Sequence, residues 1–176
     1  MKFLYLLLIA AANLLTAKVA PLDLAGGALI VPAGSLLAGA VFVLRDLVQM
    51  KHGKNKTYTV ILWASALSAV LSLSLGDTVH VAAASVMAFF ASEAADTEIF
   101  SRVRSSLPAR MLLSGAVGGL LDSVLFVVCG ISPLGANMIP WEAVPSAVFG
   151  QMLVKVGVQF AAACYLYIKH EREGSP

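Results

Sequence analysis

The chain has 176 residues, of which 59% are hydrophobic and 12% are charged. A soluble domain is usually roughly 45–50% apolar and about 25% charged, so this composition excludes an ordinary soluble protein and predicts an integral membrane protein. The net charge of +2 is too small to indicate a nucleic-acid partner, so the lipid bilayer is the first partner that the sequence implies.

Six segments have the length and the apolar character of a membrane-spanning helix, which needs roughly 20 mainly apolar residues. Within the second segment, Pro32 lacks a backbone N–H donor and is expected to kink or break the helix. The connections are short, so we expect residues 1–176 to form one all-α transmembrane domain with no soluble domain beside it. In chain order the segments are residues 3–20, 26–48, 58–75, 79–100, 110–129 and 143–169.

The connections between these segments sort by charge. Lys and Arg lie at the start of the chain, in its tail, and in the connections around residues 45–56 and 101–110. The opposite connections carry Asp23, Asp77 and Glu142 and no basic residue. Because Lys and Arg accumulate in cytoplasmic loops, this alternation predicts that both termini are cytoplasmic.

Charged residues also fall inside or at the ends of the predicted spans. A charge at the centre of a bilayer costs roughly 2.5–3.5 kcal/mol or more, so such residues normally pair with each other or face a water-filled cavity. Arg45 and Asp46 come where the second span meets the cytoplasm, and they could pair there or extend to the lipid interface. The other charged residues within spans are Lys18, Glu93, Asp96, Asp122 and Lys155.

Depth limits which of these charges can meet. Asp122 lies about 12 residues into the fifth span, roughly 18 Å at 1.5 Å per residue, which is near the midplane. Lys155 lies at a similar depth in the sixth span, so these two side chains could pair. Arg45 and Asp96 both lie near the cytoplasmic end and could form a second pair. Glu93 lies about one turn deeper than Asp96 and has no obvious cation of its own.

Polar residues form stripes along several spans, at the spacing of three or four residues that marks one helix face. Gly115 and Gly119 in the fifth span have the small-xxx-small spacing that lets helices approach closely, and we interpret them as packing residues. Because the stripes converge, the simplest interpretation is a central polar cavity. The stripes are Asn13 and Thr16 in the first span, Ser85, Phe89, Ser92 and Asp96 with Glu93 beside them in the fourth, and Gln151, Lys155 and Gln159 in the sixth.

The segment SEAADTEIF, residues 92–100, resembles the Ser-Glu-x-x-Asp-Thr-x-Ile-Phe signature of the queuosine precursor transporters, also called the vitamin uptake transporter (VUT) family. Further similar segments follow in the family's order and cover essentially the whole chain. They are AAN (11–13) with Lys18, PAGSLLAGAVFVLRDLVQ (32–49), GGLLDSVLF (118–126) and GQMLVK (150–155).

This resemblance implies six transmembrane helices in a fold similar to the S components of energy-coupling-factor (ECF) vitamin transporters. It also implies import of a queuosine precursor, 7-cyano-7-deazaguanine or 7-aminomethyl-7-deazaguanine, across the inner membrane. No cofactor is expected. The three histidines, His52, His80 and His170, lie in loops or the tail on both sides of the membrane, so they cannot form one metal site.

The chemistry of a guanine-type base suggests roles for the buried polar residues. Such a base presents an N1–H and a 2-amino group side by side, and one carboxylate can accept both hydrogen bonds. Glu93 is the first candidate for this carboxylate and Asp96 the second. Buried amides could read the carbonyl and ring nitrogens, and an aromatic ring could stack on the base. The candidates are Asn13 and Gln151 for the amide and Phe89 or Phe90 for the ring, with Asp122, Lys155 and Arg45 forming ion pairs or coupling transport to an ion.

Other classes of function are compatible with parts of the sequence. One alternative is a binding subunit for another vitamin-type molecule. It would act with an energising partner, since the chain has no Gly-x-x-x-x-Gly-Lys-Ser loop for nucleotide phosphates. A homo-oligomer is also compatible with the sequence. A structural membrane protein would use buried ion pairs only to fix helix register. An intramembrane aspartyl protease is disfavoured because Asp77, in the LGD segment, lies in a loop whereas Asp122 lies near the midplane. We therefore predict that the protein is not an enzyme.

Overall fold

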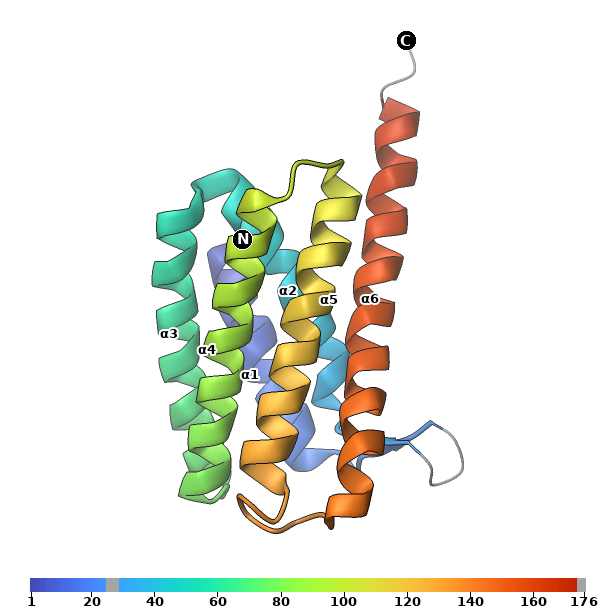
Figure 1. Cartoon of the computed structure of the whole chain (residues 1–176). Coiled ribbons are helices and arrows are strands. Elements are labelled where there is room, and N and C mark those ends of the chain that lie inside the picture. The colour runs from blue at the N-terminus through green and yellow to red at the C-terminus, as the bar shows by residue number, and fades with distance from the viewer. Residues whose placement is uncertain (25–28, 174–176) are drawn as a thin grey trace.

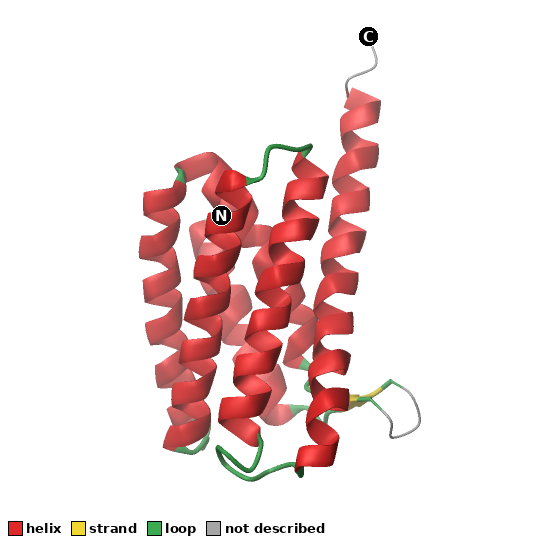
Figure 2. Cartoon of the chain, in the orientation of Figure 1, coloured by secondary structure: helices red, strands yellow, loops and turns green. Residues whose placement is uncertain are grey.

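The computed structural model describes residues 1–24 and 29–173, and α-helices dominate this part of the chain (Figure 1, Figure 2). A short antiparallel hairpin between the first two helices departs from the all-α prediction. The α5 helix continues as a π-helical turn, Phe126–Ile131, and a 3-10 turn, Trp141–Ala143, leads into α6. The elements are α1 (Lys2–Lys18), β1 (Leu22–Asp23), β2 (Ile30–Val31), α2 (Gly34–His52), α3 (Lys54–Ser74), α4 (Val79–Arg102), α5 (Leu107–Leu125) and α6 (Val144–Glu173).

The six helices form a closed ring. Neighbours along the chain pack as α1 with α2, α3 with α4, α4 with α5 and α5 with α6, and contacts of α2 with α6 and of α1 with α3 close the circle. The α2 helix also contacts α3, α4 and α5, so it lies furthest into the bundle. Figure 1 shows the start of α1 and the end of α6 towards one end of the ring and the hairpin towards the other. We call these the termini end and the hairpin end.

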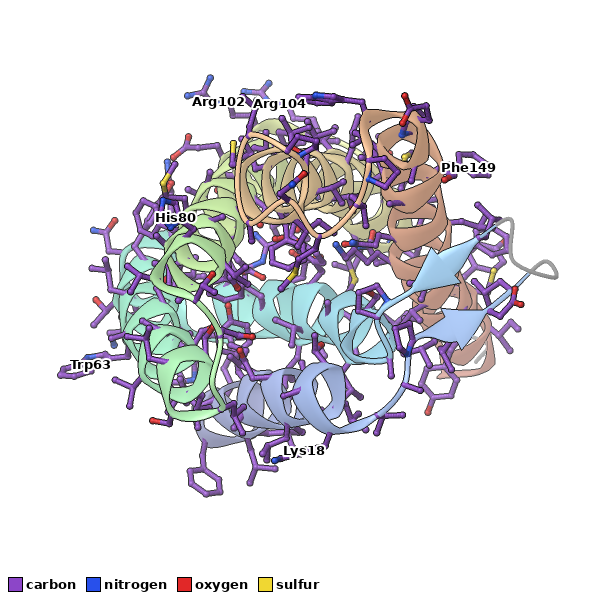
Figure 3. All side chains as sticks on the ribbon, turned by 90° about the horizontal axis from the view of Figure 1, so that it is seen from below. Lys18, Trp63, His80, Arg102, Arg104 and Phe149 are labelled. Carbon is purple, nitrogen blue, oxygen red and sulfur yellow. The ribbon has the colours of Figure 1, made fainter. Side chains whose placement is uncertain are left out.

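The helix boundaries follow the predicted segments closely except before α2. The predicted start of the second segment falls partly on residues 25–28, which lie outside the described residues, and α2 begins only at Gly34. The predicted segment is therefore broken at Pro32, one of the two expected outcomes, and α2 itself is not kinked, because a proline ahead of the first turn removes no helical hydrogen bond. Lys18, predicted inside the first span, is the last residue of α1 and is exposed at the edge of the bundle (Figure 3).

Tight turns keep the helices side by side. Gly53 joins α2 directly to α3 with φ of +81°, a left-handed conformation that a side chain would disfavour. Thr78 caps α4, and its hydroxyl accepts a hydrogen bond from the Val81 N–H at 3.3 Å. Pro108 stands in the first turn of α5, where its missing N–H removes no helical hydrogen bond. Such short connections hold all six helices around one common interior.

The outer surface of the bundle is apolar. Three stretches of the described residues are long and apolar enough to cross a membrane by length and composition, namely Lys54–Ser74, Leu107–Ile131 and Trp141–Ile168. Large side chains such as Trp63 and Phe149, 69% and 58% exposed, point away from the helices (Figure 3). A bundle with so much exposed apolar surface fits a lipid environment rather than water, so the fold indicates a membrane protein.

Candidate functional site

A cavity of about 170 Å³ lies inside the ring, and all six helices contribute to its walls. At the hairpin end the lining residues Thr16 and Asp77 are exposed. Further in, the lining residues Ile9, Phe42 and Glu93 are only 4%, 3% and 0% exposed. The cavity therefore opens at the hairpin end, the end from which Figure 3 views the ring, and closes at the level of Glu93.

Most of the residues singled out in the sequence border this cavity. Three of the predicted residues lie outside its lining: Asp96 and Arg45 are buried beyond its closed end, and Phe90 is 38% exposed. The predicted central polar cavity is thus present, and it separates residues that can touch a ligand from residues that can only support them. The predicted residues that line it are Asn13, Phe89, Glu93, Asp122, Gln151 and Lys155.

Glu93 lies at the closed end of the cavity and is fully buried. Neither of its carboxylate oxygens has a hydrogen-bond partner among the residues that the structure describes. The Tyr5 hydroxyl interacts with it from α1 without a hydrogen bond of ordinary geometry, and Arg45 Nε lies 3.6 Å from its Oε2. Because a buried carboxylate without hydrogen bonds is costly, this side chain is placed to accept hydrogen bonds from a molecule in the cavity.

A dense charge cluster lies beyond the closed end, centred on Arg45 of α2. Its Nη2 lies 2.7 Å from Asp46 Oδ1 and also pairs with Asp96 Oδ2 of α4, which confirms the predicted pair of Arg45 and Asp96. Arg45 and Asp46 are each 1% exposed, so they do not extend to the lipid interface. With Glu93, three carboxylates share one guanidinium. This group, Arg45, Asp46, Glu93 and Asp96, is called the Arg45 cluster.

Hydrogen bonds to uncharged acceptors join α2 and α4 at the Arg45 cluster and on its termini side. Arg45 Nη1 donates to Thr97 Oγ1 at 2.9 Å. One turn on, Gln49 Nε2 donates to the Thr97 carbonyl at 3.1 Å and to Ser101 Oγ at 2.8 Å. Arg45, Gln49 and Thr97 are all buried, so these contacts leave no open path from the cavity to the termini end along α2 and α4. Gln49 and Thr97 were not among the predicted site residues, although both fall in the segments that resemble the family.

Lys155 is the centre of a second charged group, in the cavity wall between α5 and α6. Its ammonium donates to Asp122 Oδ2 at 2.6 Å, to Ser123 Oγ at 2.9 Å and to Gln151 Oε1 at 3.3 Å. The pairing of Asp122 with Lys155 that depth suggested is confirmed. An ammonium has three N–H donors, and here each has an acceptor. Lys155, Asp122, Ser123 and Gln151 together are called the Lys155 group.

The two amide candidates differ in what the protein leaves available. Asn13 of α1 is half-buried, donates to the Ile9 carbonyl at 2.9 Å and accepts from Ser68 Oγ at 3.3 Å. Gln151 is 3% exposed, and its oxygen accepts from Lys155, which turns its amide nitrogen towards other partners. Gln151 can therefore offer an N–H₂ group to a carbonyl or ring nitrogen in the cavity, whereas Asn13 already has one hydrogen bond at each end of its amide.

The aromatic residues of the cavity are only partly those predicted. Phe89 lines the wall, whereas Phe90 does not. Two aromatic residues that were not predicted, Phe42 of α2 and Phe126 at the start of the π-helical turn, line it as well. Tyr5, near Glu93, was also missed. Their signal was weak because one aromatic ring in an apolar span looks the same whether it faces lipid or a cavity.

The predicted packing glycines of α5 let side chains of α6 cross close to its backbone. A Cβ at Gly115 would collide with the Gln159 amide, whose nitrogen donates to the Gly115 carbonyl at 3.2 Å. A Cβ at Gly119 would only touch Lys155, at 3.6 Å from its Cβ. The glycines thus confirm the packing interpretation and bring Lys155 into reach of Asp122.

The arrangement offers binding chemistry. No group of three or more His, Cys, Asp or Glu residues suited to a metal ion occurs in the described part of the chain. Asp77 and Asp122 both border the cavity, but Asp122 is paired with Lys155, and Asp77 accepts a hydrogen bond from Ser72 Oγ at 2.5 Å at the exposed mouth. The site has mainly apolar walls with a few polar groups, three phenylalanine rings and a deep carboxylate, which is the composition of a small-molecule pocket.

Comparison with protein families agrees with this interpretation. Residues 69–169 match the family model described as "Putative vitamin uptake transporter". The chain belongs to this family. The match covers more than half of the sequence, from the last part of α3 through α4 and α5 to most of α6. It contains both Glu93 and the Lys155 group, while Asn13 and Arg45 precede it. No curated protein and no solved structure matches the chain. Membership of the VUT family makes the protein a vitamin-type uptake transporter in a membrane, which favours transport over enzymatic activity.

Proposed function

We propose that this VUT protein imports a 7-deazaguanine precursor of queuosine, 7-cyano- or 7-aminomethyl-7-deazaguanine, through the cavity inside its helix ring. The observation that carries the proposal is Glu93, a buried carboxylate on the cavity wall whose two oxygens have no hydrogen-bond partner among the described residues. Two adjacent donors on one edge of a guanine-type base match the two oxygens of one carboxylate. Gln151 offers an amide for the carbonyl, and Phe89 offers a ring face.

The proposal includes a topology. Residues 1–176 form one domain of six transmembrane helices with both termini in the cytoplasm of a cell with an inner membrane, in a fold similar to the S components of ECF transporters. The charges in the interior of α2 and α4, which lower the apolar character of these helices, are buried in the Arg45 cluster, so they do not meet lipid. With this orientation the cavity opens to the outside and the Arg45 cluster closes the cytoplasmic side. This is the outward-open state in which an importer binds its ligand.

Uptake by cells that depend on an external precursor tests the proposal. Glu93→Gln is expected to reduce uptake at least about tenfold at equal expression, because a neutral amide cannot accept two hydrogen bonds from the base edge and leaves one pair of donors facing each other. The matched control is Glu98→Gln, the same change five residues along α4, at a carboxylate that lies outside the cavity and pairs with Lys54 at 2.6 Å. Glu98→Gln is expected to retain uptake.

Two outcomes would contradict parts of the proposal. Full uptake by the Glu93→Gln variant would remove Glu93 from the binding site. Binding without transport by the purified protein in proteoliposomes would favour the alternative of a binding subunit that needs an energising partner. In that case Glu93→Gln would still weaken binding, so the site and the transport mode are tested separately.

A further inference from the structure

The charged side chains that line the cavity do not balance. Four ionisable residues of its described lining carry formal charge: Asp77, Glu93, Asp122 and Lys155. Lys155 and Asp122 cancel each other through their 2.6 Å pair. Two carboxylates are left over, one at the mouth and one at the closed end.

The next layer of side chains does not supply the missing positive charge. Arg45 is the cation beside Glu93, but it makes its closest ion pairs with Asp46 and Asp96. Lys155 directs all three of its donors to Asp122, Ser123 and Gln151. Counted over the cavity lining and the Arg45 cluster together, five carboxylates face two cations within the described residues.

Burial makes this imbalance important. The charge of an exposed carboxylate is largely screened by water and salt, but Glu93 is fully buried and the cavity is bounded by low-dielectric side chains. Lys155 is matched to Asp122, so the unmatched charge of the lining is negative, and a buried carboxylate without a matched cation is costly. A positive charge on the ligand would offset this cost, whichever end of the ligand contacts Glu93.

We propose that the ligand of this cavity is a cation, a flat nitrogenous base that carries a protonated primary amine, and that Glu93 and Asp77 select that charge. This inference rests on the proposed function and narrows it. Of the two queuosine precursors, the aminomethyl compound carries an ammonium at neutral pH, whereas the cyano compound is neutral. A cationic ligand also gives import a driving force, because the inside-negative membrane potential draws positive charge towards the cytoplasm.

Binding to the purified full-length protein in lipid nanodiscs tests this inference. Dissociation constants are measured by calorimetry for the aminomethyl and the cyano compound, which share the same base. The aminomethyl compound is expected to bind at least about tenfold more tightly, since one buried charge pair at moderate distance gives a preference of this order. The preference for the aminomethyl compound is expected to shrink in Glu93→Gln. It is expected to shrink by a smaller factor in Asp77→Asn, because Asp77 is exposed, and to persist in the control Glu98→Gln.

Each result bears on one proposal or on both. Equal binding of the two compounds, or tighter binding of the cyano compound, would overturn the charge selection and leave the proposed function intact. Binding of neither compound would overturn both. A preference that survives in both Glu93→Gln and Asp77→Asn would show that these carboxylates are not its source. Asp77 lies in an exposed turn, so its variant remains informative even if Glu93→Gln does not fold.

Discussion

The Arg45 cluster and the Lys155 group are both buried charged networks, yet they are built in opposite ways. In the Lys155 group one ammonium meets one carboxylate and two neutral acceptors, so charges and donors are matched. In the Arg45 cluster one guanidinium is shared by three carboxylates, so negative charge is in excess. A matched pair holds helices together, whereas an unpaired negative charge beside a cavity can be neutralised by a bound ligand or ion.

Removal of the arginine at the centre of the Arg45 cluster is expected to have the largest effect on stability. Arg45→Met leaves Asp46, Glu93 and Asp96 buried together without a cation, and it is expected to cost about 3–5 kcal/mol of unfolding free energy. Unfolding of the purified protein in detergent, followed by circular dichroism, measures the loss. Arg102→Met is the matched control, because Arg102 is 81% exposed and its ion pair lies on the surface. Equal stability of the two variants would show that Arg45 does not hold the cluster together.

Removal of the lysine tests whether the second network is self-contained. Lys155→Met is expected to cost about 2 kcal/mol, less than Arg45→Met, because the stranded Asp122 is 17% exposed to the cavity and can be hydrated. Adding Asp122→Asn is expected to restore most of the lost stability, since no charge then remains without a partner. Adding Asp96→Asn to Arg45→Met is expected to restore little, because two carboxylates remain. Similar recovery in both double variants would erase the distinction between the networks.

The sequence predicted these networks to different degrees. Depth along the spans was sufficient for the pairs of Lys155 with Asp122 and of Arg45 with Asp96, because rise per residue fixes height in a bundle of parallel axes. Depth does not give the rotation of a helix. For that reason the sequence could not show that Arg45 also reaches Glu93, or that Phe89 rather than Phe90 faces the cavity.

Local chain chemistry explains the remaining differences. The apolar run from residue 26 resembles the start of a span, but residues 30–31 pair with β1 and Pro32 precedes the helix, so α2 starts later than hydropathy alone predicts. Tertiary contact, which no periodicity reveals, places Tyr5 near Glu93 and Phe126 at the cavity wall. The predicted fold class and the polar helix faces rested on composition and spacing, and these signals are strong in a membrane bundle.

Removal of single hydroxyl groups is expected to have the smallest effects on stability. These effects distinguish the Lys155 group, which has no spare acceptor, from the Arg45 cluster, which has more acceptors than donors. Ser123→Ala removes one of three acceptors of Lys155 and is expected to cost about 1 kcal/mol, since a buried N–H then lacks its partner. Thr97→Val removes an acceptor of Arg45, but carboxylate oxygens are in excess around that guanidinium and can replace it, so a loss below about 0.5 kcal/mol is expected. Both hydroxyls are buried, and unfolding midpoints of the two variants are compared in the same detergent. If Thr97→Val were the more costly change, Arg45 would be short of acceptors, and the excess of negative charge that separates it from Lys155 would not govern the stability of the cluster.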